Sequence, residues 1–282
     1  MSDNESILFI EKEILKVIDK IHFGFDSEVL CILDNVNASA RDIELLKEKI
    51  SADILVRLFN IANSIYWGSM QKGIVNSFYD VVMRLGMDYT KALITFFALN
   101  QLSKGNKEVE TMLAKDYATS VLARILAEEI NLSPISAKKV ELAGILMNIG
   151  KIIITIYDKF YKPSNICIDQ SFISDNHKNI GKKVIDRFSL PPFLKGWIDS
   201  DCLVLYEKDI SLSSVVTLAA NSINESFRKF GNRWVIKALM PDSNNKLGRT
   251  IGKFIEDQFS AIGLGAYIDI IRIDEEEIKK IV

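Results

Sequence analysis

The sequence predicts an all-α protein, and three observations lead to that fold class. Apolar residues recur every three or four positions over most of the chain, which is the period of a helix with one buried face. Segments with the two-residue alternation of a β-strand are rare. Proline is scarce, with 5 among 282 residues, and 48% of the residues are hydrophobic. The chain therefore has enough apolar side chains for a large helical core.

The N-terminal part is expected to form a series of short helices. Ser2 followed by Glu5 fits a capping box for a helix that starts near Glu5, and Ser39 followed by Asp42 has similar spacing. Gly86 is a good residue to end a helix that starts at Ser77. Further helices are expected to start after Asp26 or Ser27, at Asp53 and at Asp88.

The segment Ser103–Lys107 contains Gly105 and Asn106 among charged residues, and it is the best position for a boundary between two halves. The expected division is residues 1–104 and residues 105–282. The second half is expected to hold a long helix over 108–130 and a pair of helices that starts at Ser133-Pro134 and breaks at Gly150. After a loop over 162–171, further helices are expected over 174–188, 192–200, 211–228, 232–239 and around Phe254–Phe259, with a short strand and an acidic helix over 267–282.

Composition excludes several classes of function. The net charge of -2, without a dense run of lysine and arginine, gives no global attraction to nucleic acid or to an anionic membrane. The acidic N-terminus is unlike a signal peptide. The most apolar stretch, 142–157, is interrupted by Asn148 and Lys151 and is too short to span a bilayer. The expected location is the cytoplasm.

The three cysteines Cys31, Cys167 and Cys202 are far apart and form no CxxC pair. This spacing suits a reducing compartment, and the cysteines are expected to be small buried hydrophobic residues.

Two segments together resemble the HDOD family. The first contains Asp53, then Asn63-Ser64-Ile65-Tyr66-Trp67-Gly68, then Leu85-Gly86. The family has an acidic residue, a helix, an Asn-Ser-aromatic-Gly turn and a Leu-Gly helix stop in this order. The main physical role expected of Asn63 and Ser64 is to end a helix, with Gly68 supplying a positive φ and Tyr66 packing against the neighbouring half.

The second segment runs from Gly144 to Lys151. HD-superfamily phosphohydrolases have Gly-Leu-Leu-His-Asp-Ile-Gly-Lys here, and in this chain His-Asp is replaced by Met147-Asn148. A weaker match lies at His177, with Gly181 four residues later and Leu190-Pro191 further on. The resemblance covers roughly residues 25–225. It implies a multi-helical HDOD-like fold, in which an N-terminal helical bundle packs on an HD-like half, and a role in bacterial signal transduction.

The same resemblance implies that the metal ligands of HD enzymes are lost. The chain has only two histidines, His22 and His177. The family's first ligand histidine falls at Lys115, its late aspartate at Asn221, and its tandem histidines near Ser200 and Asp201. Only His177 survives, and it is expected to be a satisfied, partly buried residue. No catalytic residue, metal ion or cofactor is therefore expected.

Lys115 raises a further hypothesis. An ammonium group at the position of a metal ligand could replace the charge of the metal and pair with Asp201 or Asp116. The alternative is that Lys115 extends along the surface to solvent.

The leading functional hypothesis is a non-enzymatic regulatory module that binds a protein or a small ligand. Its candidate pocket consists of Lys115, Met147, Asn148, His177 and Asn221. Analogy with the family suggests a sensor kinase, a response regulator or a cyclic-nucleotide pathway as the partner, and neither nucleic acid nor membrane is expected. A residual metal-dependent hydrolase acting on a nucleotide or cyclic dinucleotide, and a purely structural or oligomerising domain, are the alternatives.

Overall fold

Helices form nearly all of the described structure, as the all-α prediction requires. The computed structural model describes residues 3–20, 24–64, 73–103, 105–164, 166–198, 206–207, 210–230 and 233–236. The helices are α1 (Asp3–Lys20), α2 (Ser27–Asp34), α3 (Ala40–Leu45), the 3-10 helix η1 (Leu46–Lys49), α4 (Ala52–Ala62), α6 (Phe78–Leu85), α7 (Met87–Ser103), α8 (Lys107–Glu129), α9 (Pro134–Leu146), α10 (Ile149–Phe160), α11 (Gln170–Arg187), α12 (Phe193–Ile198) and α13 (Leu212–Ser226). Two short antiparallel hairpins pair β1 (Tyr206–Glu207) with β2 (Ile210–Ser211), and β3 (Phe227–Phe230) with β4 (Arg233–Ile236).

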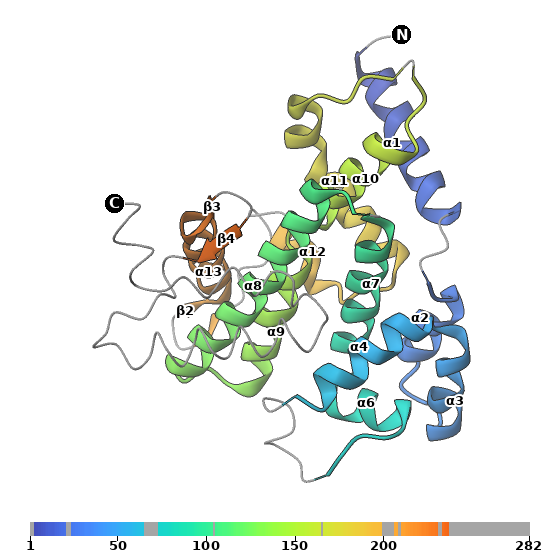
Figure 1. The fold of residues 1–282 in the computed structure, drawn as a ribbon, viewed down its shortest axis with the longest axis vertical. Helices are drawn as coiled ribbons and strands as arrows, with labels where there is room; N and C mark the ends of the chain where they lie inside the picture. The colour runs from blue at the N-terminus through green and yellow to red at the C-terminus, as the bar shows by residue number, and fades with distance from the viewer. Residues whose placement is uncertain are drawn as a thin grey trace.

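Figure 1 shows how the helices are arranged around α7. Helices α2, α3, α4 and α6 form a group at one end, and α8, α9 and α13 pack together on the other side of α7. Helix α1 lies away from the N-terminal group, beside α10. The contacts of α7 with α2, α4 and α6 and with α8 and α9 make it the element between the two groups. The division of the chain at residues 104 and 105 stays a prediction.

Several predicted helix ends are confirmed by their capping hydrogen bonds. The Asp26 side chain accepts from Glu28 N, and Ser39 and Asp42 form the complete capping box. Ser77 and Ser133 cap α6 and α9 in the same way. Gly86 ends α6 with a φ of 89°, a conformation that glycine adopts without strain.

Other boundaries were predicted wrongly. The break between α9 and α10 lies at Met147 and Asn148, not at Gly150, which is inside the first turn of α10. Helix α11 begins at Gln170 rather than near residue 174, because the Asp169 side chain caps it by accepting from Phe172 N. Helix α4 begins one residue before Asp53.

The helix expected over 232–239 is also wrong, since Arg233–Ile236 is strand β4. Gly231-Asn232 separates two runs of aromatic and β-branched residues, which is a signal for a two-residue hairpin that the helical interpretation overlooked. The expectations for Ser2, His22, Tyr66, Gly68, Asp201, Cys202 and residues 237–282 lie outside the described residues.

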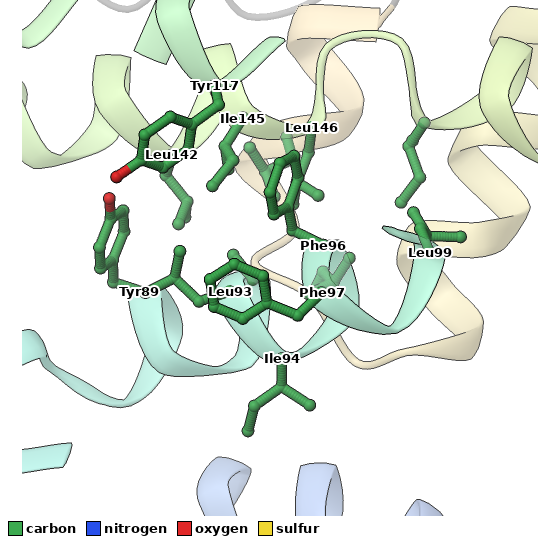
Figure 2. Packing of buried hydrophobic residues seen from close by; sticks show 14 of the residues in the cluster. Tyr89, Leu93, Ile94, Phe96, Phe97, Leu99, Tyr117, Leu142, Ile145 and Leu146 are labelled. Atoms are coloured by element: carbon green, nitrogen blue, oxygen red, sulfur yellow. The ribbon is translucent and has the colours of Figure 1, made fainter. Parts of the chain in front are cut away.

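The centre of the core lies where α7 meets α8 and α9. Figure 2 shows Phe96 and Phe97 of α7 packed beneath Tyr117 of α8 and a row of α9 residues that includes Leu142 and Ile145. The Phe96 ring lies 5.8 Å from the Tyr117 ring, measured between centroids. Each of these side chains is almost completely removed from water, so the hydrophobic contribution to stability is concentrated here.

The cysteine prediction is wrong for the two cysteines that are described. Cys31 and Cys167 are both exposed. Cys31 lies on the outer side of α2, while Val29, Leu30 and Leu33 of the same helix are buried.

The residues of α9 and α10, 134–160, are long and apolar enough to cross a membrane by length and composition alone. In the structure, 83% of the most apolar window is buried inside the protein. The expectation that this stretch is too short and too polar to span a bilayer is therefore wrong by length and composition, and its apolarity is accounted for by its place in the core.

A buried ion pair connects the three central helices. The Arg124 guanidinium of α8 donates to the Glu141 carboxylate of α9 over 2.6 Å, and the Tyr89 hydroxyl of α7 donates to the same carboxylate over 2.8 Å. Burial raises the pKa of Glu141, while Arg124 and Tyr89 act in the opposite direction. The carboxylate is therefore held in the core by its partners.

A second buried cation connects α7 with more distant segments. The Lys91 side chain is 1% exposed, and its Nζ lies 2.8 Å from Asp34 Oδ1 of α2 and 3.2 Å from Asp88 Oδ1. It also donates to the carbonyl of Ser189, just after α11, over 3.0 Å.

We predict that Arg124→Met lowers the free energy of unfolding by about 3–5 kcal/mol, because it leaves the Glu141 carboxylate buried without its cation. Urea denaturation at neutral pH measures this change. The triple variant Arg124→Met/Glu141→Leu/Tyr89→Phe removes all three polar groups and should recover most of the loss.

The exposed pair Lys47–Glu44 is the matched control, because Lys47→Met should cost less than about 1 kcal/mol. If Arg124→Met were as mild as Lys47→Met, the buried pair would not be the central constraint that we describe.

Candidate functional site

The Asn63 and Leu85-Gly86 motifs hold together the two ends of the segment 65–72. The Asn63 side chain donates to the Val75 carbonyl over 3.1 Å and accepts from Val75 N over 2.8 Å. Arg84, just before the Leu85-Gly86 pair, donates to the carbonyls of Ala62 and Gly73, each over 3.0 Å. Leu85 is fully buried, and Ser64 is half-buried at the end of α4. Asn63 is the residue that ends α4, while the roles expected for Tyr66 and Gly68 lie outside the described residues.

The glycines of the second motif allow helices to cross at very short distance. A Cβ atom on Gly144 would lie 2.6 Å from Ser120 Cα of α8. A Cβ atom on Gly150 would lie 1.9 Å from the carbonyl oxygen of His177 on α11. The motif therefore fixes the positions of α8, α10 and α11, whatever chemistry the intervening residues carry.

The break between α9 and α10 is attached to a buried carboxyl group. Asp116 of α8 is 0% exposed, and Asn148 donates to it twice, from its backbone N over 3.2 Å and from Nδ2 over 2.6 Å. Burial raises the pKa of Asp116 to about 8, although the two Asn148 hydrogen bonds and the charges of Lys151 and Lys115 lower it. The group is therefore mostly protonated at neutral pH.

The charges of two half-buried lysines act on this carboxyl group. Lys115 Nζ donates to Asn224 Oδ1 of α13 over 3.2 Å, and its charge acts on Asp116 from within the same helix. Lys151 lies in the first turn of α10, and its charge acts on both Asp116 and His177. The predicted partner Asp201 lies outside the described residues, so the charge-replacement hypothesis stays a prediction.

His177 is held by its own helix. Its Nδ1 lies 3.0 Å from the Ile173 carbonyl and 2.8 Å from the Ser174 carbonyl, so Nδ1 carries the proton in the neutral ring. Burial lowers the pKa of His177, and the charge of Lys151 lowers it further. The neutral ring therefore presents Nε2 as a hydrogen-bond acceptor.

The structure brings together only part of the predicted pocket. Asn148 contacts Asp116 directly, and the charge of Lys115 acts on Asp116, whereas His177 is related to them only through the charge of Lys151. Met147 is half-buried beside Asn148, whereas Asn221 is exposed on α13, one turn before Asn224. Asp116, Lys151 and Asn224 were not among the predicted pocket residues. The sequence did offer one indication that Asp116 is buried: it is an acidic residue directly before Tyr117-Ala118 in a helix that was expected to lie in the core.

The donor set at this position differs from that of a divalent metal site. Within the described part of the chain, no three His, Cys, Asp or Glu side chains come close enough to hold a metal ion. Both oxygens of Asp116 accept hydrogen bonds from Asn148, and the neighbouring charges are positive. These residues do not fit the several carboxylate and imidazole ligands that a catalytic metal requires.

Comparisons with known proteins identify the fold. A family model described as the HDOD domain matches residues 26–200. A solved structure from Shewanella amazonensis, provisionally named a metal-dependent phosphohydrolase, is 16% identical with a TM-score of 0.51, over 93% of this chain and 99% of that chain. An HDOD domain protein of unknown function from Geobacter sulfurreducens is 17% identical with a TM-score of 0.46, over 99% and 97% of the two chains. No curated protein matches the chain.

We predict that Gly150→Ala lowers the free energy of unfolding by about 3 kcal/mol or more, because the new methyl group collides with the backbone of α11. Gly181→Ala is the matched control on the facing helix. Its Cβ would approach the flexible end of Ile198 at 3.0 Å, so we expect a cost below about 1.5 kcal/mol. Thermal and urea denaturation of both variants test the difference, and equal costs would contradict the close crossing at Gly150.

We predict that Asp116 makes stability fall as the pH rises. The folded state holds the Asp116 proton up to a pKa of about 8, whereas the unfolded chain loses it near 3.8. The folded state therefore binds more protons between these values, and the contribution of Asp116 decreases from about pH 4 to about pH 8 by up to about 5 kcal/mol.

Asp116→Asn should remove this pH dependence, at a constant cost of about 1 kcal/mol for one hydrogen bond that an NH₂ group cannot accept. Urea denaturation between about pH 5 and pH 9 measures the effect. Asp175→Asn, which changes an exposed carboxylate of α11, is the control and should keep the wild-type slope. An unchanged slope in Asp116→Asn would show that Asp116 is already ionised at low pH.

Proposed function

Because the chain belongs to the HDOD domain family, we propose that it is a non-catalytic regulatory module that binds a protein partner or a small ligand in signal transduction. The family match covers residues 26–200, and the described fold contains helical groups on both sides of α7. In this proposal the fold works by presenting a binding surface, and it carries out no reaction.

The observation that carries the proposal is the double hydrogen bond from Asn148 to Asp116. In a metal site, a buried carboxylate at this position would offer its oxygens to the cation. Here both oxygens already accept N–H groups, and Lys115 and Lys151 supply positive charge that repels a divalent cation. The frame of the HD motif is retained because Gly144 and Gly150 are needed for packing, which requires no catalysis.

Partner and location follow from family analogy. We expect a sensor kinase, a response regulator or a cyclic-nucleotide pathway of a bacterial cytoplasm as the context, with neither nucleic acid nor a membrane as a partner. The near-zero net charge supports the exclusion of nucleic acid and membrane as partners, since it provides no electrostatic attraction to either.

We predict that the full chain, purified and incubated with Mn²⁺, Fe²⁺ or Zn²⁺, retains no stoichiometric metal after desalting and does not hydrolyse a generic phosphodiester or cyclic dinucleotides. Elemental analysis and product chromatography measure these two properties. A catalytically active HD phosphohydrolase treated in parallel is the positive control.

Stoichiometric metal together with turnover would overturn the proposal and favour the residual metal-dependent phosphohydrolase. Light scattering and affinity capture from the native lysate, followed by a direct binding measurement with the captured protein, test the regulatory role against a purely oligomerising domain.

A further inference from the structure

We propose that α1 covers a helix-binding surface on α10 and α11, and that an acidic amphipathic helix of a protein partner binds this surface by displacing α1. The inference rests on the proposed function, because it names the binding surface and the kind of partner of a regulatory module. Helix α1 would act as a competitor within the same chain, which lowers the apparent affinity for the partner.

The place of α1 in the fold is the first step. Helix α1, Asp3–Lys20, precedes the residues 26–200 that match the HDOD domain model. It makes its main contacts with α10 rather than with α2, the next helix along the chain. Figure 1 shows α1 at the edge of the molecule, apart from the group of α2, α3, α4 and α6. An element held in this way can open locally while the rest of the fold stays intact.

The apolar face of α1 is the second step. Ile14 and Ile18 are 0% and 3% exposed, and Ile10 and Leu15 pack against the core as partly buried residues. Their spacing of three and four residues places them on one stripe of the helix. Among the α1 side chains that the structure describes, the apolar attachment is confined to this stripe.

A buried carboxylate makes this attachment selective. The Glu11 side chain is 5% exposed, Lys183 Nζ donates to its Oε2 over 2.7 Å, and Asn179 Nδ2 donates to its Oε1 over 2.5 Å. Both donors lie on α11, one helical turn apart, so together they form a carboxylate-binding site on the surface that α1 covers. A carboxylate that is buried on docking loses its water and needs such donors in return. The surface therefore selects a helix with an acidic residue at this position.

Helix α1 itself shows which partner fits the surface. Its contacts use a glutamate at position 11 and isoleucines three and seven positions later. A partner helix with the same pattern can place its carboxylate on Lys183 and Asn179 and its aliphatic residues on the apolar part of the surface. This is the mode in which an amphipathic helix is bound in a groove. Docking of α1 and binding of the partner helix exclude each other, because both use the same donors.

The test uses a fluorescent synthetic peptide of residues 3–20 as the partner helix, titrated with the full chain. The variant Ile14→Asp/Ile18→Asp places two charges on the buried stripe of α1, so its α1 should no longer dock. We expect saturable binding of the peptide to this variant, at least tenfold tighter than to the wild type, because the competing helix is lost. Far-UV circular dichroism establishes that the other helices of the variant are folded.

Two further changes identify the polar contacts. A peptide with Glu11→Gln, and the variant chain with Lys183→Met added, should each reduce the affinity roughly tenfold, which is the effect of losing one charge-assisted hydrogen bond. A peptide with Lys16→Met is the matched control. The Lys16 side chain is 62% exposed on α1, so this change should leave the affinity unaltered.

Hydrogen exchange tests the displacement of α1 without a disruptive variant. In the wild-type chain we expect the backbone amides of α1 to exchange at least tenfold faster than those of α9, because α1 opens locally. Glu11→Gln in the full chain should accelerate exchange in α1 and leave α9 unchanged.

Peptide binding that is absent, equal for the two chains, or insensitive to Glu11→Gln and Lys183→Met would overturn the inference. Amides of α1 that exchange as slowly as those of α9 would overturn it as well. Metal analysis and turnover test the proposed function independently, so a chain without metal or turnover whose α1 stays docked would refute only the displacement of α1.

Discussion

The structure depends on the buried ion pair between Arg124 and Glu141, which Tyr89 completes. A buried carboxylate without partners would carry a large desolvation cost, so α7, α8 and α9 must adopt the one arrangement in which both partners reach it. The apolar side chains around it, among them Phe96 and Leu142, supply most of the favourable free energy, but apolar contacts alone tolerate several arrangements. The polar network therefore selects the arrangement, and the apolar core stabilises it.

The motif frame and the chemistry of the site have separate physical causes. Gly144 and Gly150 lie at helix crossings where a Cβ atom would collide with the backbone of the facing helix, so this chain needs glycine there. Met147 and Asn148 lie between them at a break in the helix, where the only requirement is that the freed backbone N–H finds a partner. The Asp116 carboxyl group is that partner, because its Oδ2 accepts a hydrogen bond from the backbone N–H of Asn148. A family resemblance based on the glycines thus indicates the fold, and the intervening residues must be considered separately for function.

The buried Asp116 carboxyl group is surrounded by a hydrogen-bond donor and by positive charge rather than by further carboxylates. Asn148 donates to both of its oxygens, the charges of Lys151 and Lys115 act on it, and burial raises its pKa to about 8. The proposed regulatory role rests on this arrangement around Asp116.

The sequence by itself determined the all-α class, the HDOD resemblance and the capped helix ends at Ser39, Ser77 and Gly86, because these depend on local periodicity and on hydrogen bonds within a few residues. The HDOD resemblance also placed Lys115, Asn148 and His177 in one candidate pocket, which stays a prediction. Only the tertiary structure decided that the helix breaks at Asn148 rather than at Gly150, and that Asp116 and Lys151 complete the site while Asn221 is exposed. These features depend on contacts between residues far apart in the chain, such as Asp116 with Asn148 and Gly150 with His177, and no local pattern encodes such contacts.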